Sequence, residues 1–178
     1  MADYRRIYVP NGTYFFTVNL QDRSSNLLIS EIAKLRAAFA KVKLKHDFHI
    51  DAVTILPDHL HCVVTFGQAT NYSDVIRLIK SYFSKSLPKG EHRTASRVSK
   101  SERGIWQRRY WTHLITSEDD YNRHIEYCYI NPVKHGYVER VRDWPYSSFH
   151  RDVKRGLFTS DWGGTKGGFE KMLEFGER

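Results

Sequence analysis

Two histidines interrupt an apolar stretch of the chain. The segment ILPDHLHCVVTF (residues 55–66) places His59 and His61 two positions apart, with one leucine between them. Alternate side chains of a β-strand share a face, so both imidazoles would point the same way. Two such imidazoles can hold one divalent ion, because imidazole is a common ligand for transition metals. Two unrelated surface histidines would show the same spacing, so the pair alone is a weak indication of a metal site.

A second group of candidate residues lies in YNRHIEYCYINPVKHG (residues 121–136). On a helix, Tyr127 and Asn131 are one turn apart and therefore neighbours on its surface. A tyrosine beside a carboxamide could be a nucleophile next to a metal ligand. It could equally be an amphipathic residue whose ring packs against the protein. Tyr129 would point about 200° around the helix from Tyr127, so only one of them can face the histidines.

Hydrophobic periodicity predicts the elements that would carry these residues. Four strands are expected, at residues 13–20, 48–56, 59–66 and 105–116. Three helices are expected. The first covers residues 30–45 with Ser30 as its N-cap, and the second begins after an N-cap at Ser73. The third runs from Ser117 to about Asn131, where Pro132 disfavours continuation. Between them, residues 84–104 are polar, with six Lys or Arg against two Glu, which predicts a basic flexible loop.

The order β-α-β-β-α-β followed by a further helix predicts an α+β fold of the ferredoxin-like or RRM-like type. In that fold an antiparallel sheet carries its helices on one face, and the other face stays open for a ligand. The apolar residues that alternate with the histidines would meet the helices, and the histidines would lie on the open face. We expect one domain over residues 1–150, an additional catalytic helix within it, and a C-terminal tail at 151–178.

Composition limits the partners and the location of the protein. A net charge of +8 and a pI near 9.5 favour a polyanionic partner, nucleic acid first. Cys62 and Cys128 sit in apolar contexts, which indicates buried reduced thiols. No apolar run is long enough to span a bilayer, and the first 18 residues do not resemble a signal peptide, so we expect no membrane contact and a cytoplasmic location.

Several motifs together resemble those of a known family. The histidine–hydrophobic–histidine motif is followed by HIEYCYINPVKHG (124–136) and DWPYSSFH (143–150). This set resembles the single-tyrosine HUH transposases, specifically the REP-associated tyrosine transposases. The segments YRRIYVPNGTYFFTVNL (4–20) and IWQRRYWTHLI (105–115) are similar too. The resemblance spans about residues 4–162.

The resemblance implies a mechanism and a substrate. His59 and His61 would bind Mg²⁺ or Mn²⁺ with Asn131 as the third ligand, and Tyr127 would attack DNA to form a covalent 5′-phosphotyrosine. His124 is a candidate general base, although a solvated helical histidine is the simpler interpretation. The substrate would be single-stranded DNA next to a repetitive extragenic palindrome hairpin, bound by a nucleoid-associated bacterial protein that is a monomer or a homodimer.

Basic and aromatic residues along the chain are candidates for holding this DNA, because cations contact phosphates and aromatic rings stack on unpaired bases. They are Tyr4, Arg5, Arg6, Lys80, Lys85, Arg108, Arg109 and Trp111. For any one cation, a solvated surface charge is the alternative, and for Trp111 and Trp144 the alternative is core packing.

Two other functions remain open at this stage. A catalytically silent nucleic-acid-binding module on an RRM-like sheet would not need two histidines and a tyrosine, and HLHCVVTF (59–66) lacks the aromatic pattern of RNA-binding strands. A rolling-circle replication initiator would use similar chemistry, usually in a larger chain with a helicase domain.

Overall fold

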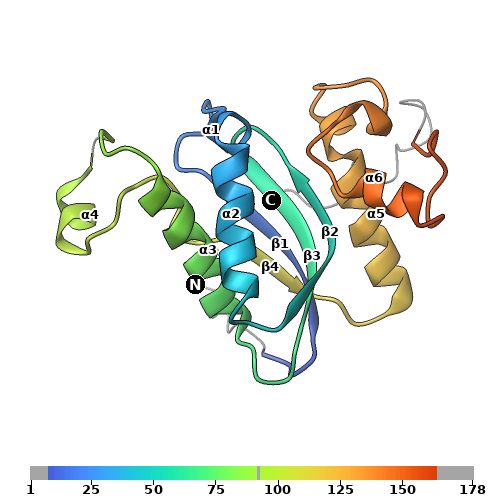
Figure 1. The fold of residues 1–178 in the computed structure, drawn as a ribbon, viewed down its shortest axis with the longest axis horizontal. Helices are drawn as coiled ribbons and strands as arrows, with labels where there is room; N and C mark the ends of the chain where they lie inside the picture. Colours follow the sequence, from blue (N-terminus) through green and yellow to red (C-terminus); the bar gives the residue numbers. More distant parts are fainter. Residues whose placement is uncertain (1–7, 92, 164–178) are drawn as a thin grey trace, which may run out of the picture.

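The structure, a computed structural model, describes residues 8–91 and 93–163, and its centre is a four-stranded antiparallel sheet (Figure 1). The strands are β1 (Thr13–Asn19), β2 (Phe48–Ile55), β3 (His59–Phe66) and β4 (Trp111–Leu114). Within the described residues, the helices are α1 (Leu27–Ser30), α2 (Ile32–Lys43), α3 (Tyr72–Ser86), α4 (Ala95–Ser99), α5 (Glu118–Lys134), α6 (Phe149–Lys154) and the 3-10 turn η1 (Val141–Asp143).

The strand order is β2-β3-β1-β4, and each neighbouring pair is antiparallel. This is the order expected of the predicted β-α-β-β-α-β arrangement, so the α+β fold class is confirmed. The histidine-bearing strand β3 is central, hydrogen-bonded to β1 on one side and β2 on the other. His61 lies opposite Thr17 of β1 and Thr54 of β2, which fixes the backbone of the histidine pair from both sides.

Alternation along the strands builds two cores, one on each face of the sheet. The predicted apolar face is confirmed: Phe16, Leu60 and Cys62 are buried against α2 and α3. The opposite face is not open, as expected from the sequence, because α5 and α6 cover it (Figure 1). The reason is that Phe15 and Val63 make this face apolar as well, and burying each such side chain contributes about 1.5–3 kcal/mol.

Helix α5 is built by signals that the sequence shows at both ends. The Ser117 hydroxyl accepts the Asp120 amide at 3.1 Å, and three acidic residues occupy the first turn, which favours the start of a helix. The helix does not end near Asn131 as predicted but continues through Pro132 to Lys134. A proline this close to the end removes a single backbone hydrogen bond, and its buried ring packs with the rest of the helix.

The end of α5 is set by Gly136, which adopts a positive φ of 73°. The Gly136 amide donates to the Val133 carbonyl at 3.0 Å, and the Tyr137 amide donates to the Pro132 carbonyl at 2.9 Å. These two bonds form a Schellman motif, which terminates a helix where glycine permits the left-handed conformation. The chain therefore turns away one residue after His135.

Other predicted boundaries shift by a few residues. Ser30 closes α1 and does not cap α2, and α3 is capped by Asn71, whose side chain accepts the Ser73 amide at 2.8 Å. The segment 84–104, expected to be a loop, contains the last residues of α3 and all of α4. The fourth strand is confined to β4 at residues 111–114, because the preceding residues meet the sheet through one isolated bridge, Trp106 to Leu20.

The C-terminal part of the described chain is tied to the sheet. Helix α6 runs across the expected boundary between residues 150 and 151, and the Arg151 guanidinium donates to the Ile50 carbonyl of β2 at 2.8 Å. Cys62 and Cys128 are free and buried, as predicted. Among the residues that the structure describes, none of the helices has the length and apolar character needed to cross a bilayer.

Candidate active site

The two histidines of β3 point into the layer between the sheet and α5. Their side chains are fully enclosed, with 2% of His59 and none of His61 exposed to solvent. The ring centroids lie 4.9 Å apart with the rings nearly perpendicular. The strand alternation predicted from the sequence therefore brings both imidazoles to one point, although that point is buried.

Each imidazole is oriented by a hydrogen bond at Nδ1. His59 Nδ1 lies 2.7 Å from the Asp58 carboxylate, which also pairs with Arg23 at 2.6 Å. His61 Nδ1 lies 2.9 Å from the Thr17 hydroxyl. The Asp58 carboxylate can only accept, so His59 carries its proton on Nδ1 and a lone pair on Nε2. The Thr17 hydroxyl can accept as well as donate, so it is compatible with the same tautomer of His61. Both Nε2 atoms are buried and have no hydrogen-bond partner among the described residues, which fits two metal ligands held by outer partners.

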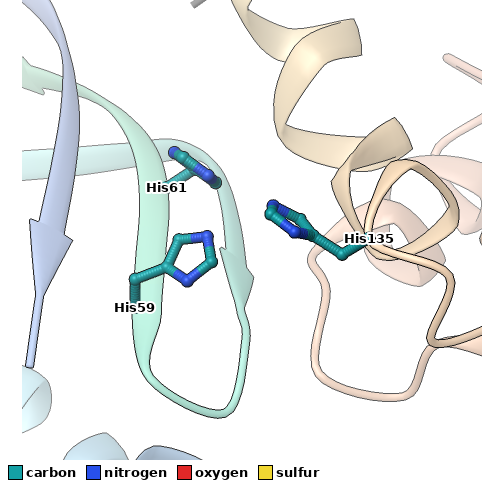
Figure 2. A group of neighbouring side chains, drawn as sticks. All are labelled: His59, His61 and His135. Carbon is teal, nitrogen blue, oxygen red and sulfur yellow. The ribbon is translucent and has the colours of Figure 1, made fainter. Parts of the chain in front are cut away.

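A third imidazole completes this group. Figure 2 shows His135, from the end of α5, turned toward His59 and His61 of β3. The ligand atoms of the three histidines all lie within 4.8 Å of one another, and the His59 and His135 ring centroids are 5.1 Å apart. Three imidazole nitrogens around one point fit a divalent ion that keeps open positions for other ligands.

Asn131, the third ligand implied by the family resemblance, lies beside the same group. Its side chain is fully buried, and its amide nitrogen donates to the Tyr127 carbonyl at 2.6 Å. Its carbonyl oxygen Oδ1 is buried with no hydrogen-bond partner in the described part of the chain. The Asn131 side chain also acts on His61, whose pKa it raises against the effect of burial, so the position offers an oxygen close to His61.

Burial keeps the histidines in the form that binds metal. Desolvation lowers the pKa of His61 well below its usual value, and the neighbouring His59 and His135 lower it further. Desolvation also lowers the pKa of His59, although the hydrogen bond to Asp58 opposes that shift. Both rings are therefore neutral at neutral pH, and a neutral imidazole is the metal-ligating form.

Helix α5 brings Tyr127 to the histidines. The Tyr127 ring is 1% exposed, and its centroid lies 5.3 Å from that of His61. Phe15 packs edge-on against the Tyr127 ring, with the ring centroids 5.7 Å apart. The Lys134 ammonium lies over the Tyr127 ring, 5.1 Å from its centroid. The structure thus places a phenol, a cation and three imidazoles in one site.

Tyr129 points the opposite way, as its position on the helix predicts. Its hydroxyl donates to the Asp152 carboxylate of α6 and lies 3.1 Å from the Ser148 hydroxyl. Burial and the neighbouring Asp152 raise the pKa of Tyr129, so this phenol stays protonated. Of the two tyrosines, only Tyr127 contacts the histidine pair through its ring.

The candidate base His124 is not solvated, contrary to the simpler interpretation of the sequence. It is 1% exposed, its Nδ1 lies 2.8 Å from the Asp120 main-chain carbonyl, and its ring stacks on His113 of β4 at 4.7 Å. His113, Asp120 and His124 form a second group with closely spaced ligand atoms. In this group the Asp120 carboxylate already pairs with His113 at 2.8 Å and with His124 at 3.0 Å.

The candidate DNA contacts fall into two regions. A groove of about 520 Å³ runs between α3 and the segment 97–108, and Lys80, Lys85 and Arg108 line it. Arg109 and Trp111 are exposed at β4, so Trp111 is not a core residue, whereas Trp144 is buried and donates to the Ile55 carbonyl at 3.0 Å. Tyr4, Arg5 and Arg6 lie outside the described residues.

Sequence reasoning missed several residues of this site. His135 was not predicted, because the helix was expected to end before it; Gly136 was the signal for the later end. Asp58 was not selected as a site residue, although a carboxylate directly before the first histidine is well placed to orient it. The sequence around Thr17 and Lys134 did not indicate that they belong to the site. Thr17 reaches His61 through the pairing of β1 with β3, and Lys134 reaches Tyr127 through its position on α5.

An antiparallel sheet with paired buried histidines, facing a helix that presents a tyrosine, is the arrangement that the resemblance to the single-tyrosine HUH transposases implies, and the comparisons agree with this class. Residues 9–131 match the family described as "Transposase IS200 like". A REP-associated tyrosine transposase of Escherichia coli strain K12 is 44% identical over 165 residues, which cover 92% of each chain. A Haemophilus influenzae protein provisionally given the same name is 45% identical over 166 residues, 92% of this chain and 94% of that one.

A solved structure, described as a REP-associated tyrosine transposase bound to a REP hairpin, superposes with a TM-score of 0.80 at 43% identity. The match covers 100% of this chain and 98% of the other. The chain therefore belongs to the REP-associated tyrosine transposases, and it is a transposase.

Proposed function

We propose that the protein cleaves and rejoins single-stranded DNA next to REP hairpins, through a covalent 5′-phosphotyrosine on Tyr127 and with a divalent ion at the histidines. The observation that carries the proposal is the packing of the Tyr127 ring against His61, whose Nε2 is buried and uncommitted. The solved relative bound to a REP hairpin supports the substrate. The proposal includes a location with the nucleoid in a bacterial cytoplasm, because the proposed substrate would be there.

The ion would be held by His59, His61 and His135, with the oxygen of Asn131 as a further ligand. A ligand set with several imidazoles favours Mn²⁺ over Mg²⁺ in binding strength, although either can serve. When bound, the ion neutralises and polarises the scissile phosphate. Asp58 and Thr17 hold the rings in orientation, so the lone pairs are directed inward before any ion arrives.

Tyr127 performs the covalent step. Its phenolic oxygen forms a bond to phosphorus while the bond from phosphorus to the 3′ oxygen breaks. The phenol loses its proton and the 3′ oxygen gains one, so the leaving group is a 3′-hydroxyl and the net proton count is unchanged. The Lys134 ammonium over the ring favours the developing negative charge of the phenolate. The product diester is similar in energy to the original one, so another 3′-hydroxyl can reverse the step and join strands without ATP.

The test is a denaturing-gel assay on a labelled oligonucleotide that carries a REP hairpin and its flanking single strand. Tyr127→Phe should abolish cleavage and the covalent protein–DNA adduct, while binding stays within a few-fold, because only the hydroxyl is lost. Tyr129→Phe is the matched control, since its hydroxyl faces Asp152, and it should still cleave. Full cleavage by Tyr127→Phe, or normal turnover in excess EDTA, would overturn the mechanism.

A further inference from the structure

An exposed tryptophan stands at the edge of the site and has no role in the chemistry described above. Trp111 of β4 is 43% exposed, although an indole of this size is ordinarily mostly buried. His113 stacks under it with an interplanar angle of 6°, and Phe15 meets it edge-on at 5.5 Å. The exposed part of the indole is therefore a surface that faces away from both neighbours and is held in place by them.

The strand register places this indole beside the catalytic group. Trp111 lies opposite Thr17 on β1, and Thr17 lies opposite His61 on β3. Directly opposite residues point to the same face of a sheet, and two strand spacings put the backbones of Trp111 and His61 about 10 Å apart. Phe15 contacts Trp111, His61 and Tyr127 alike, at centroid distances of 5.5, 5.6 and 5.7 Å.

The surroundings of Trp111 favour a nucleic acid over a protein. Arg109 precedes it by two residues and is exposed, so a cation that can contact a phosphate lies close to the indole along the chain, whereas Arg108 pairs with Glu102 at 2.8 Å. Strand β4 has only four residues, and such short edge strands are poor templates for pairing with another chain. An exposed ring beside cations is the arrangement by which proteins stack unpaired bases.

We propose that Trp111 is the stacking surface for an unpaired base adjacent to the scissile phosphate, and that it thereby positions this phosphate at Tyr127. The inference rests on the proposed function and adds a residue that sets the register of the single strand. Stacking supplies affinity without selecting one base, so Trp111 fixes where the strand lies, and base-specific contacts elsewhere choose the sequence.

The experiment measures binding in a Tyr127→Phe background, in which no cleavage interferes. The probe is a set of oligonucleotides with a REP hairpin and a flanking single strand, each with one abasic nucleotide at a different position around the cleavage site. Trp111→Ala should weaken binding of the intact strand by about 5- to 150-fold. On the strand that is abasic at the stacked position, the same substitution should lower the binding affinity by less than twofold. Trp111→Phe should retain part of the affinity.

Tyr8→Ala is the matched control, because Tyr8 is also an aromatic residue with 43% exposure but lies before the far end of β1. It should leave binding and the abasic profile unchanged. If Trp111→Ala lowers the binding affinity by the same factor on every abasic strand, the stacking role is wrong. The cleavage assay with Tyr127 intact tests the proposed function separately. A change of oligomeric state in Trp111→Ala with an unchanged abasic profile would instead assign the indole to a protein contact, which also overturns the proposal.

Discussion

At the scale of single residues, the orientation of His59 depends on one carboxylate. Asp58 Oδ1 lies 2.7 Å from His59 Nδ1, and its other oxygen pairs with Arg23. Asp58→Asn keeps the shape of the side chain but removes the charge that fixes this ring. We expect metal affinity to fall about 10- to 100-fold, as it commonly does when an outer partner of a metal-ligating histidine is lost. Titration with Mn²⁺, followed by electron paramagnetic resonance, measures it.

The control for this substitution is Asp74→Asn on α3. Asp74 also pairs with an arginine, Arg77, at 3.1 Å, but it is exposed and contacts none of the three histidines. It should leave Mn²⁺ affinity unchanged. Equal affinities for wild type and a folded Asp58→Asn variant would mean that the carboxylate does not support the metal site.

At the scale of elements, one carboxylate joins β4 to the start of α5, the helix that carries Tyr127. Burial raises the pKa of Asp120, but hydrogen bonds from His113 and the Thr116 amide, with the nearby His124, outweigh burial, and the net pKa is lowered. A depressed carboxyl pKa stabilises the fold above the unfolded-state pKa of about 3.9, and this contribution disappears as pH falls through the folded-state value.

Asp120→Asn should therefore lower the free energy of unfolding by about 1–3 kcal/mol at pH 7. The difference from wild type should shrink as pH approaches 3, because the wild-type carboxylate is then protonated too. Urea unfolding at several pH values measures both effects. Asp119→Asn, an exposed neighbour in the same first helical turn, controls for the lost charge at the helix start, and it should show a smaller and flatter effect.

The same elements show what the sequence alone could and could not predict. The strands that carry Phe16 and the two histidines were predicted because alternation is a local property of the chain. The end of α5 was predicted too early, because Pro132 was given more weight than Gly136, and His135 was lost with it. The second apolar face was missed because Phe15, Val63 and the buried side of α5 come together only through tertiary pairing.

Across the whole molecule, the basic groove and the site lie on different faces of the sheet but at the same end. The Gln107 amide of the groove wall donates to the Asn19 carbonyl at 3.0 Å, and Asn19 lies opposite His59. Figure 1 shows α3 and α4 on one side of the sheet and α5 on the other. The free edge at β4, where Trp111 is exposed, offers DNA a path between the two.

This path predicts a dependence of DNA binding on salt. Lys85 and Lys100 line the groove with exposed side chains, so each can contact a phosphate and release a counterion. Replacing both by alanine should reduce the slope of log affinity against log salt by about 1.4 for a single strand.

The paired control is Lys43→Ala with Lys45→Ala, which removes the same charge from exposed positions just before Phe48, at the end of the sheet away from His59. Fluorescence anisotropy from 50 to 300 mM salt (roughly the range over which phosphate contacts dominate) measures both slopes. Equal slopes for the two double variants would mean that the strand does not follow the groove, and the DNA would then have to approach Tyr127 from the α5 side alone.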